Sequence, residues 1–314
     1  MQVFCKSVTA TEMRHVLNPL TTWAGSHFKS FDFTGDIDDR AALEYLSQND
    51  FSGATCEEIT IRLTNLSRIH EDAFAGNTLV TWKLSLPYNL LTEQVFLVTA
   101  KFKKLQVLVL TYNRIEKIPT TAFSSDQREL YKIDLAFNNI TAIGNDAFAN
   151  LPSLDQIILS NNKIKIIGSN AFMTRGMPTN DRPLIIDLEV NSLTSRSFRS
   201  ESLRSKRTVL LNIAVNHVTV VSQNVFKQIF DSGGVIDMKG NPMTCDCRLY
   251  TFLLMVSREK CRNCQCANGS SIHSLNAASA RCPISLPTIP PYVTTPGDRV
   301  IFPLPRSETD SLQP

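Results

Sequence analysis

The chain has 314 residues, a formal net charge of +3 and 43% apolar residues. The apolar content is sufficient for a large core, and a charged fraction of 19% excludes a wholly disordered chain. The mild charge does not require a nucleic-acid partner. No apolar run reaches the roughly 18 to 20 residues that span a bilayer. We therefore expect one elongated domain or two ordinary ones, with no membrane span in this chain.

The first 55 residues lack a regular pattern, and we interpret 1–55 as a degenerate N-terminal cap with the first repeats. The N-terminus has no basic flank, long apolar stretch or small-residue cleavage site, as a signal peptide would have. Cys5 and Cys56 flank the first clear repeat, as the disulfide-bonded cysteines of an N-terminal cap would. We therefore expect that the chain is truncated and that its true N-terminus lies upstream.

A repeat of about 25 residues occupies 56–243. Three copies, at 105–123, 130–148 and 154–172, align without gaps and place apolar residues at fixed distances around an asparagine. This position recurs every 24 or 25 residues, apart from one interval of 29. It is occupied by Thr64, Asn89, Asn113, Asn138, Asn162, Asn191, Asn216 and Asn241. Such a period predicts a solenoid of about eight stacked units.

Each unit begins with a short alternation of apolar and polar residues, which predicts a strand with its apolar side chains pointing inward. The asparagine amide can then bond backbone groups of adjacent turns that would otherwise be buried without a partner. A later Ile and Phe close the opposite side. This pattern resembles the leucine-rich repeat. The resemblance implies an α/β fold, a curved right-handed solenoid with a parallel sheet on its concave face.

Two columns of side chains on the predicted concave face form a candidate binding surface. One column stands directly before the asparagine and is aromatic in three successive units. The other stands four positions before it and is acidic in the C-terminal units. Aromatic rings beside polar groups are typical of protein interfaces; the alternative is that the rings pack into the turn as structure. The predicted protein-binding residues are Tyr88, Tyr112, Phe137, Asp134, Asp187, Glu189 and Asp237.

The longer interval contains an insertion, 173–183, whose turn residues predict a surface loop. It is followed by a run, 194–208, that is rich in Arg and Lys and contains a single acid, Glu201. The part from Arg196 to Arg207 could bind a sulfated glycan or an acidic partner. Residues 204–207 also resemble a furin-type processing site, and the remaining alternative is a solvated convex surface.

Six of the eight cysteines fall between Cys245 and Cys282. A zinc site would need a second C-x2-C or more histidines than His273, and a redox centre would need a strand-to-helix turn around Cys261 and Cys264. We therefore interpret 244–282 as a disulfide-tied C-terminal cap, because the pattern resembles the cysteine-rich caps of secreted leucine-rich repeat proteins. That resemblance implies pairs Cys245–Cys266 and Cys247–Cys282. Cys261 and Cys264 would pair with each other, or one of them would replace Cys266.

Disulfides require an oxidising compartment, and three triplets offer N-glycosylation acceptors at Asn65, Asn139 and Asn268. Asn65 and Asn139 directly follow the repeated asparagine position and should face solvent. The segment 283–314 contains eight of the 15 prolines and predicts a disordered tail. We therefore predict a secreted, extracellular glycoprotein.

The sequence has no G-x-S-x-G, P-loop or H-E-x-x-H motif, and its histidines are scattered, so we predict no catalytic residue, cofactor or metal. Residues 5–282 also resemble a family of secreted arthropod proteins that includes the non-catalytic subunit of Oplophorus-luciferin 2-monooxygenase. That resemblance implies an accessory role. We predict a secreted, non-enzymatic scaffold that binds proteins with its concave face. The alternatives are an accessory subunit of an extracellular luciferase-like or monooxygenase-like complex, and an ectodomain fragment of a cell-surface or innate-immune receptor.

Overall fold

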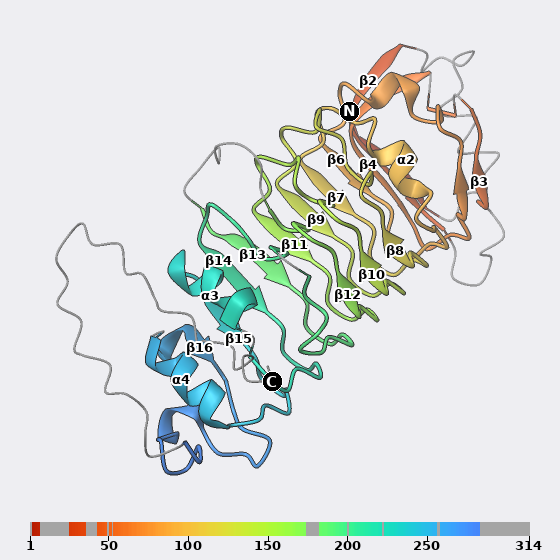
Figure 1. The fold of residues 1–314 in the computed structure, drawn as a ribbon. Coiled ribbons are helices and arrows are strands. Elements are labelled where there is room, and N and C mark those ends of the chain that lie inside the picture. Colours follow the sequence, from red (N-terminus) through yellow and green to blue (C-terminus); the bar gives the residue numbers. More distant parts are fainter. Residues whose placement is uncertain are drawn as a thin grey trace, which may run out of the picture.

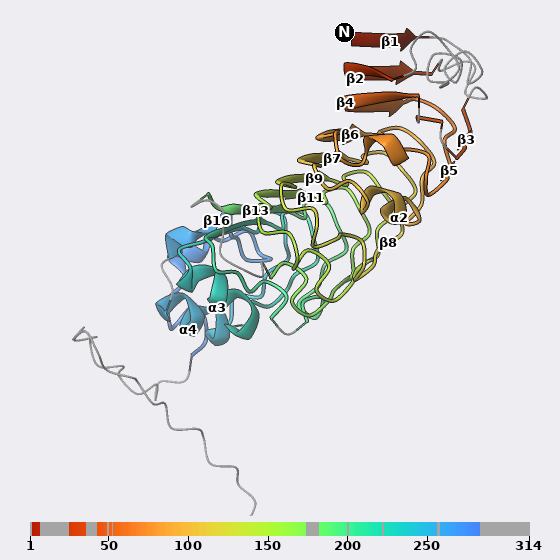
Figure 2. The same ribbon diagram turned by 90° about the horizontal axis from the view of Figure 1, so that it is seen from above.

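The computed structural model describes residues 2–6, 25–35, 43–48, 50–51, 53–173, 182–199, 201–221, 223–255 and 258–282. Within these residues the chain winds into one curved solenoid, seen along its face in Figure 1 and from above in Figure 2. The solenoid predicted from the repeat is confirmed. The predictions for the insertion at 174–181 and for the tail at 283–314 lie outside the described residues.

The concave side is one continuous parallel sheet of eleven strands among the described residues. The sheet already begins at Gln2, so it extends through the region that the sequence left without a repeat. In spatial order the strands are β1 (Gln2–Lys6), β2 (Ser26–Thr34), β4 (Ala54–Arg62), β6 (Lys83–Ser85), β7 (Val107–Val109), β9 (Lys132–Asp134), β11 (Gln156–Ile158), β13 (Leu184–Asp187), β14 (Val209–Asn212), β15 (Val235–Asp237) and β16 (Cys261–Arg262).

The opposite side contains short strands and single-turn helices. Three strands form a second parallel sheet, β8 (Lys117–Ile118), β10 (Ala142–Ile143) and β12 (Ile166–Ile167), and two more pair as β3 (Tyr45–Leu46) and β5 (Arg68–Ile69). The helices are α2 (Val95–Thr99), α3 (Gln223–Asp231), α4 (Cys247–Met255), η2 (Ala75–Asn77), η3 (Arg258–Lys260) and η4 (Ile272–Ser274). Figure 2 shows α2 and α3 on the side away from the large sheet. No helix of the described part is long and apolar enough to cross a membrane.

The core lies between the two sides and is built from repeated positions. The central residue of each three-residue concave strand is buried, as Leu108, Ile133 and Ile157 show. The phenylalanine at the end of each unit packs on its counterpart in the next turn, with centroids 5.3 Å apart for Phe123 and Phe148 and 5.5 Å apart for Phe148 and Phe172. Each fully buried ring contributes about 2 to 3 kcal/mol of hydrophobic stabilisation. Stacking of neighbouring turns therefore supplies the core that one unit cannot form alone.

The repeated asparagines form a buried ladder. The Asn138 amide nitrogen donates to the carbonyl oxygens of Leu110 in the preceding turn, at 2.9 Å, and of Leu135 in its own turn, at 3.1 Å. Its amide oxygen accepts the backbone N–H of Ile115 at 3.1 Å. The Asn89 amide donates in the same way, but its oxygen accepts the backbone N–H of Thr64. All three contacts recur at the other positions, Asn113, Asn162, Asn191, Asn216 and Asn241. The asparagine ladder thus satisfies the backbone where each turn leaves the sheet.

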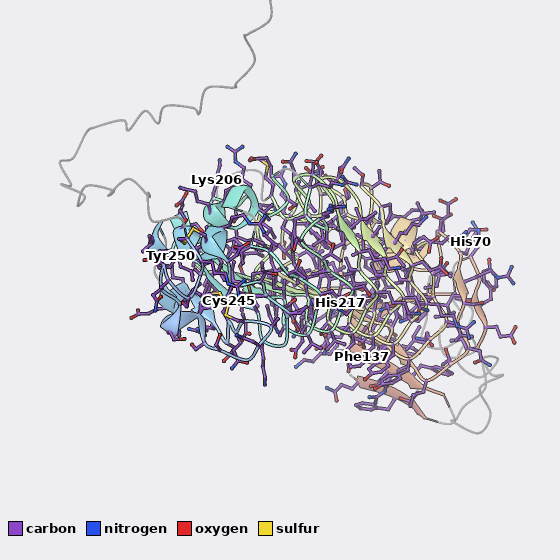
Figure 3. All side chains as sticks on the ribbon, turned by 60° about the horizontal axis from the view of Figure 1, so that its bottom comes forward. His70, Phe137, Lys206, His217, Cys245 and Tyr250 are labelled. Atoms are coloured by element: carbon purple, nitrogen blue, oxygen red, sulfur yellow. A yellow bond between two sulfur atoms is a disulfide. The ribbon has the colours of Figure 1, made fainter. Side chains whose placement is uncertain are left out.

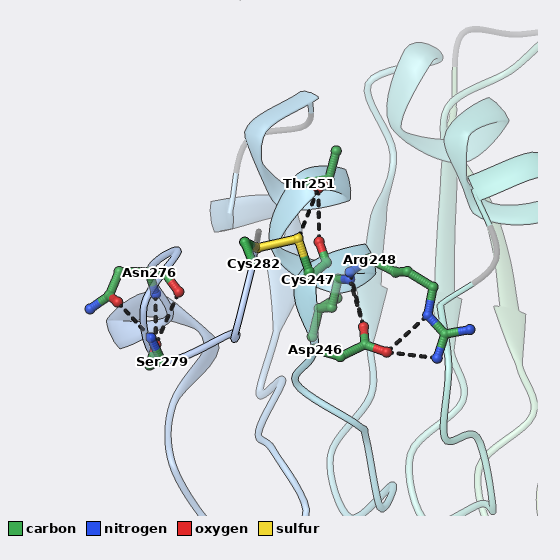
Figure 4. Close-up of a disulfide and its surroundings, with 8 residues drawn as sticks. Asp246, Cys247, Arg248, Thr251, Asn276, Ser279 and Cys282 are labelled. Atoms are coloured by element: carbon green, nitrogen blue, oxygen red, sulfur yellow. Dashed lines mark hydrogen bonds and ion pairs between the residues drawn. A yellow bond between two sulfur atoms is a disulfide. The ribbon is translucent and has the colours of Figure 1, made fainter. Parts of the chain in front are cut away.

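Three disulfides tie the C-terminal cap: Cys245–Cys266, Cys247–Cys282 and Cys261–Cys264. The first two are the pairs implied by the resemblance, and the surplus cysteines close a small loop together. Figure 4 shows the Cys247–Cys282 bond at the start of α4, where the Asp246 carboxylate accepts the backbone N–H groups of Arg248 and Leu249 and so caps the helix. The cap also extends the sheet, because Cys261 pairs with the buried Ile236 position.

The predicted disulfide at Cys5 and Cys56 is wrong. Cys56 is a free, buried thiol. In the sheet Cys5 is level with Phe33 of β2, whereas Cys56 is level with Phe28 of the same strand. The two cysteines are therefore on strands that are not adjacent, about 10 Å apart across the sheet and about 16 Å apart along it. A disulfide cannot bridge Cα atoms more than about 7 Å apart.

Candidate protein-binding surface

The residue directly before each ladder asparagine has a left-handed backbone. Its φ lies between 52° and 70° in all eight units, at Leu63, Tyr88, Tyr112, Phe137, Asn161, Val190, Val215 and Gly240. This conformation lets the chain turn out of the strand while the next side chain points inward. It costs a residue other than glycine about 1 to 2 kcal/mol, and Asn and Gly tolerate it best. Three successive units nevertheless place an aromatic residue there.

Tyr88, Tyr112 and Phe137 form a continuous aromatic row. The rings of Tyr88 and Tyr112 are stacked with centroids 4.2 Å apart, and those of Tyr112 and Phe137 are stacked at the same distance. Their exposed fractions are 47%, 38% and 42%. The rings therefore stand on the surface, contacting one another across turns, and are not buried within the turn. Figure 3 shows Phe137 at one edge of the solenoid, with Lys206 at the opposite edge.

The aromatic row ends at a hollow of about 160 Å³ on its N-terminal side, where Leu63 occupies the position of the next ring. Leu63, Thr64, Asn65, Tyr88, Asn89, Leu90 and Tyr112 line this hollow. The pKa of the Tyr112 hydroxyl is raised, because loss of hydration and the adjacent Tyr88 hydroxyl both disfavour a phenolate. The Tyr112 hydroxyl is therefore a neutral hydrogen-bonding group at physiological pH.

The predicted acidic residues occupy the ends of concave strands and are partly used by the fold. Asp134, Asp187 and Asp237 each accept the backbone N–H two residues ahead, at 3.2, 3.1 and 3.0 Å. Burial raises the pKa of the Asp134 carboxyl, and the charge of Asp187 raises it further. Glu189 accepts the Asn212 amide at 3.1 Å. One oxygen of each aspartate thus stabilises its own turn. The acidic half of the face therefore offers a partner fewer carboxylate oxygens than the sequence suggests.

A second hollow of about 210 Å³ lies on the C-terminal part of the concave face. It combines apolar side chains with Asp237 and with Arg262 of the cap strand β16, a residue that the sequence did not single out. The lining residues are Ile185, Leu210, Leu211, Asn212, Val235, Asp237 and Arg262. Because β16 was not recognised as a strand, nothing in the sequence placed Arg262 on this face.

The basic run divides into buried and exposed parts. Arg207 is only 5% exposed, and its guanidinium contacts the Asp155 carboxylate at 2.6 Å and the Leu154 carbonyl at 2.8 Å. Arg204 pairs with Glu201 at 3.0 Å, whereas Arg196 and Arg199 are exposed. A processing enzyme would have to bind Arg207, so a cleavage site at 204–207 is incompatible with this burial.

The three predicted glycosylation acceptors differ in exposure. Asn65 and Asn139 are half-buried rather than fully facing solvent, and Asn268 is exposed. The Asn139 amide oxygen accepts the Lys163 ammonium at 2.8 Å. The Asn268 amide oxygen accepts the Ser270 hydroxyl at 2.8 Å. No group of His, Cys, Asp or Glu in the described part is arranged to hold a metal ion.

Two protein-family models match the repeated part of the sequence. A family model of the leucine rich repeat matches residues 128–174, and a model of the BspA type leucine rich repeat region matches residues 25–128. No curated protein matches the chain. The closer resemblance to the luciferin-monooxygenase subunit family therefore stays a prediction.

Two solved structures are similar in fold. One is a chain of the octameric complex of Latrophilin 3 (Lec, Olf), Unc5D (Ig, Ig2, TSP1) and FLRT2 (LRR), with a TM-score of 0.52, 19% identity, and coverage of 81% of this chain and 83% of that chain. The other is human 5T4 (Wnt-activated inhibitory factor 1, trophoblast glycoprotein), with a TM-score of 0.51, 17% identity, and coverage of 80% and 87%. At these identities the similarity shows the fold alone.

Proposed function

Because this chain is a leucine-rich repeat protein, we propose that it is an extracellular, non-enzymatic scaffold that binds a protein partner with its concave face. The aromatic row of Tyr88, Tyr112 and Phe137 is the proposed centre of that contact. The repeats supply a rigid frame, and the variable side chains between the ladder asparagines supply the specificity.

The backbone at the aromatic row is the observation that carries the proposal. A left-handed position favours Gly or Asn, yet three adjacent turns hold large rings that remain about 40% exposed. The fold imposes this backbone in all eight units, so the choice of an exposed ring at three successive positions, and not the strain itself, points to function. Aromatic side chains are also the commonest energetic anchors of protein interfaces, since they bury a large area with few rotatable bonds.

The proposed extracellular location rests on the cap. Three disulfides within 38 residues, between Cys245 and Cys282, require an oxidising compartment for their formation. One similar structure is named a glycoprotein and the other belongs to a complex of several proteins, which supports a receptor ectodomain as a second candidate. The accessory subunit of a luciferase-like or monooxygenase-like complex rests on sequence resemblance alone. The absence of catalysis is likewise part of the proposal.

Site-specific photo-crosslinking tests the proposed contact. A benzophenone amino acid replaces Tyr112 in the chain exported by cultured cells, and illumination is followed by identification of adducts. Tyr131 is the matched control, because it is also a tyrosine exposed by 38% but lies outside the aromatic row. We expect a defined protein adduct from position 112 that position 131 does not give. Equal adducts at both positions, or none at position 112, would contradict the proposal.

The identity of the adduct separates the candidates. A secreted oxidase or luciferase-like enzyme would favour the accessory subunit, and a membrane receptor would favour the ectodomain. The triple variant Tyr88→Ala, Tyr112→Ala and Phe137→Ala should lose the same partner while the melting temperature falls by only a few degrees. The single variant Tyr131→Ala should retain the partner.

A further inference from the structure

Exposed cations are concentrated in the segments that follow the asparagine ladder, on three of four successive turns. These segments, 114–118, 139–143, 163–167 and 192–199, lead from the concave sheet towards the convex side. They contain six exposed cations and one carboxylate, Glu116. We call the six cations the basic flank: Arg114, Lys117, Lys163, Lys165, Arg196 and Arg199.

Two turns of the basic flank are neighbours across the insertion. Ile167 forms a parallel bridge with Phe198, and the backbone N–H of Ile167 donates to the Ser197 carbonyl. The bridge brings the turn of Lys163 and Lys165 beside the turn of Arg196 and Arg199. Four exposed cations therefore lie on two adjacent turns, and neither segment contains a carboxylate.

The three lysines that precede β7 are compensated. Lys101 pairs with Asp72 at 3.2 Å, Lys103 with Asp126 at 3.1 Å and Lys104 with Glu129 at 2.7 Å. Each of these pairs joins neighbouring turns. Among the described residues, none of the basic flank forms an ion pair. The positive charge of the basic flank is therefore available to an anionic partner.

We propose that the basic flank binds a linear sulfated polysaccharide. A polymer with repeated anionic groups is complementary to pairs of exposed cations that occur on three turns of one flank. Disulfide formation implies an oxidising compartment, whereas nucleic acids and the strongly anionic leaflet of membranes are cytoplasmic partners. Exposed lysine binds such polymers as a point charge and arginine through its planar fork of donors, and both release counterions.

The proposal refines the glycan site expected from the sequence and does not depend on the concave interface. Arg196 and Arg199 belong to the basic flank, but Arg207 is buried against Asp155 and Arg204 is paired with Glu201. The flank instead gains Lys163 and Lys165 from the preceding turn. An N-linked glycan at Asn139 would lie next to Lys163, so all chains used in the test carry Thr141→Ala to remove that acceptor.

Heparin is the probe for the test, with affinity measured as a function of salt concentration. In the variant Lys165→Gln/Arg196→Gln we expect the dissociation constant to rise about tenfold or more near physiological salt. The slope of log affinity against log salt should also fall by about two, one for each lost contact. The matched control Lys103→Gln/Lys104→Gln removes the same charge from the compensated segments and should change the dissociation constant less than about twofold.

Several outcomes would overturn the proposal. Equal weakening in both double variants would show a general effect of net charge, and absence of heparin binding by the parent chain would exclude the site. Tighter binding to duplex DNA of matched charge, or to vesicles of anionic lipid, would assign the flank to a different polyanion. Circular dichroism should show unchanged melting for both double variants, because all four side chains are exposed or half-exposed.

Discussion

Two neighbouring rows of residues run along the solenoid and differ in almost every property. The asparagine ladder is buried, with exposed fractions of 3% to 9%, and is nearly constant in residue type. The row directly before it is left-handed, exposes up to 48% of its side chains and includes Tyr, Phe, Val, Asn and Gly. Two adjacent positions of the repeat therefore have separate roles. One satisfies the hydrogen bonds of the backbone, and the other is available to a partner.

The cause of this difference is geometric. A ladder residue must offer two donors and an acceptor to two turns at once, and only a short amide does so. The first unit has Thr64 there, whose hydroxyl instead donates to the Asn89 amide oxygen. The preceding residue meets no such demand, because its side chain points away from the core. Its identity therefore reports on what contacts the surface, apart from the cost of its backbone conformation.

Asn138→Ala tests the first row and should have the largest effect. The substitution leaves the backbone N–H of Ile115 buried without a partner, which costs about 1 to 3 kcal/mol. It also removes the hydrogen bonds to the carbonyls of Leu110 and Leu135, worth about 1 kcal/mol each, although Asn113 and Asn162 still donate to these carbonyls. We expect the free energy of unfolding in urea to fall by about 3 to 5 kcal/mol. Asn139→Ala, one residue along, is the control and should cost less than about 1 kcal/mol. A similar loss of unfolding free energy in both variants would show that the ladder position has no special role in stability.

Cys56 is buried, as the ladder asparagines are. The pH dependence of its contribution to stability tests how much burial alone matters for a polar group. Burial raises the pKa of its thiol from 9.0 to about 12. The unfolded thiol thus ionises first as pH rises, so its contribution to stability is complete below pH 9 and is lost between pH 9 and 12. At pH 10.5 we expect this contribution to be smaller by about 2 kcal/mol.

Urea unfolding of the chain and of Cys56→Ala across this pH range measures the effect as a difference, since other titrating groups cancel. A pH dependence that is the same in both proteins would show that the thiol ionises normally in the fold. The thiol should also resist alkylation until the chain unfolds.

Val190→Asn tests the second row and should have a smaller effect of opposite sign. Val190 has a φ of 53°, which is unfavourable for a β-branched residue and acceptable for Asn. We expect the free energy of unfolding to rise by about 1 kcal/mol. The reverse change, Gly240→Val at a φ of 70°, should lower it by a similar amount. Destabilisation by Val190→Asn would indicate that the side chain, and not the backbone, determines stability there.

The sequence predicts the features that repeat. The positions of the strands, the asparagine ladder and the phenylalanine column recur with one period, so chance agreement is small. The cap pairs Cys245–Cys266 and Cys247–Cys282 followed from the resemblance to secreted leucine-rich repeat proteins, which left the pairing of Cys261 and Cys264 open. Three successive aromatic residues indicated the continuous row, and Asn161 and Gly240 at the same position of other units were the available signal for a left-handed backbone.

Features that depend on register or on distant partners were not predictable. Arg207 is buried because its guanidinium contacts Asp155, which precedes the insertion in the sequence. The sequence around Arg207 shows only a run of basic residues. Cys5 and Cys56 appeared to flank one repeat, but a strand between them separates them in the sheet. The adjacency of the turns that hold Lys165 and Arg196 likewise depends on the bridge between Ile167 and Phe198, which spans the insertion.

The most direct test of this interpretation compares the unfolding free energies of two neighbouring single variants, Phe137→Ala in the aromatic row and Asn138→Ala in the ladder. Phe137→Ala removes one ring stack, worth about 0.5 to 1.5 kcal/mol, and the burial of the covered part of the ring, worth about 1 kcal/mol, against a larger expected loss in Asn138→Ala. We predict that Phe137→Ala is the more stable of the two. If removing one exposed ring destabilises the chain more than removing one buried amide, the aromatic row is part of the fold and the interpretation is contradicted.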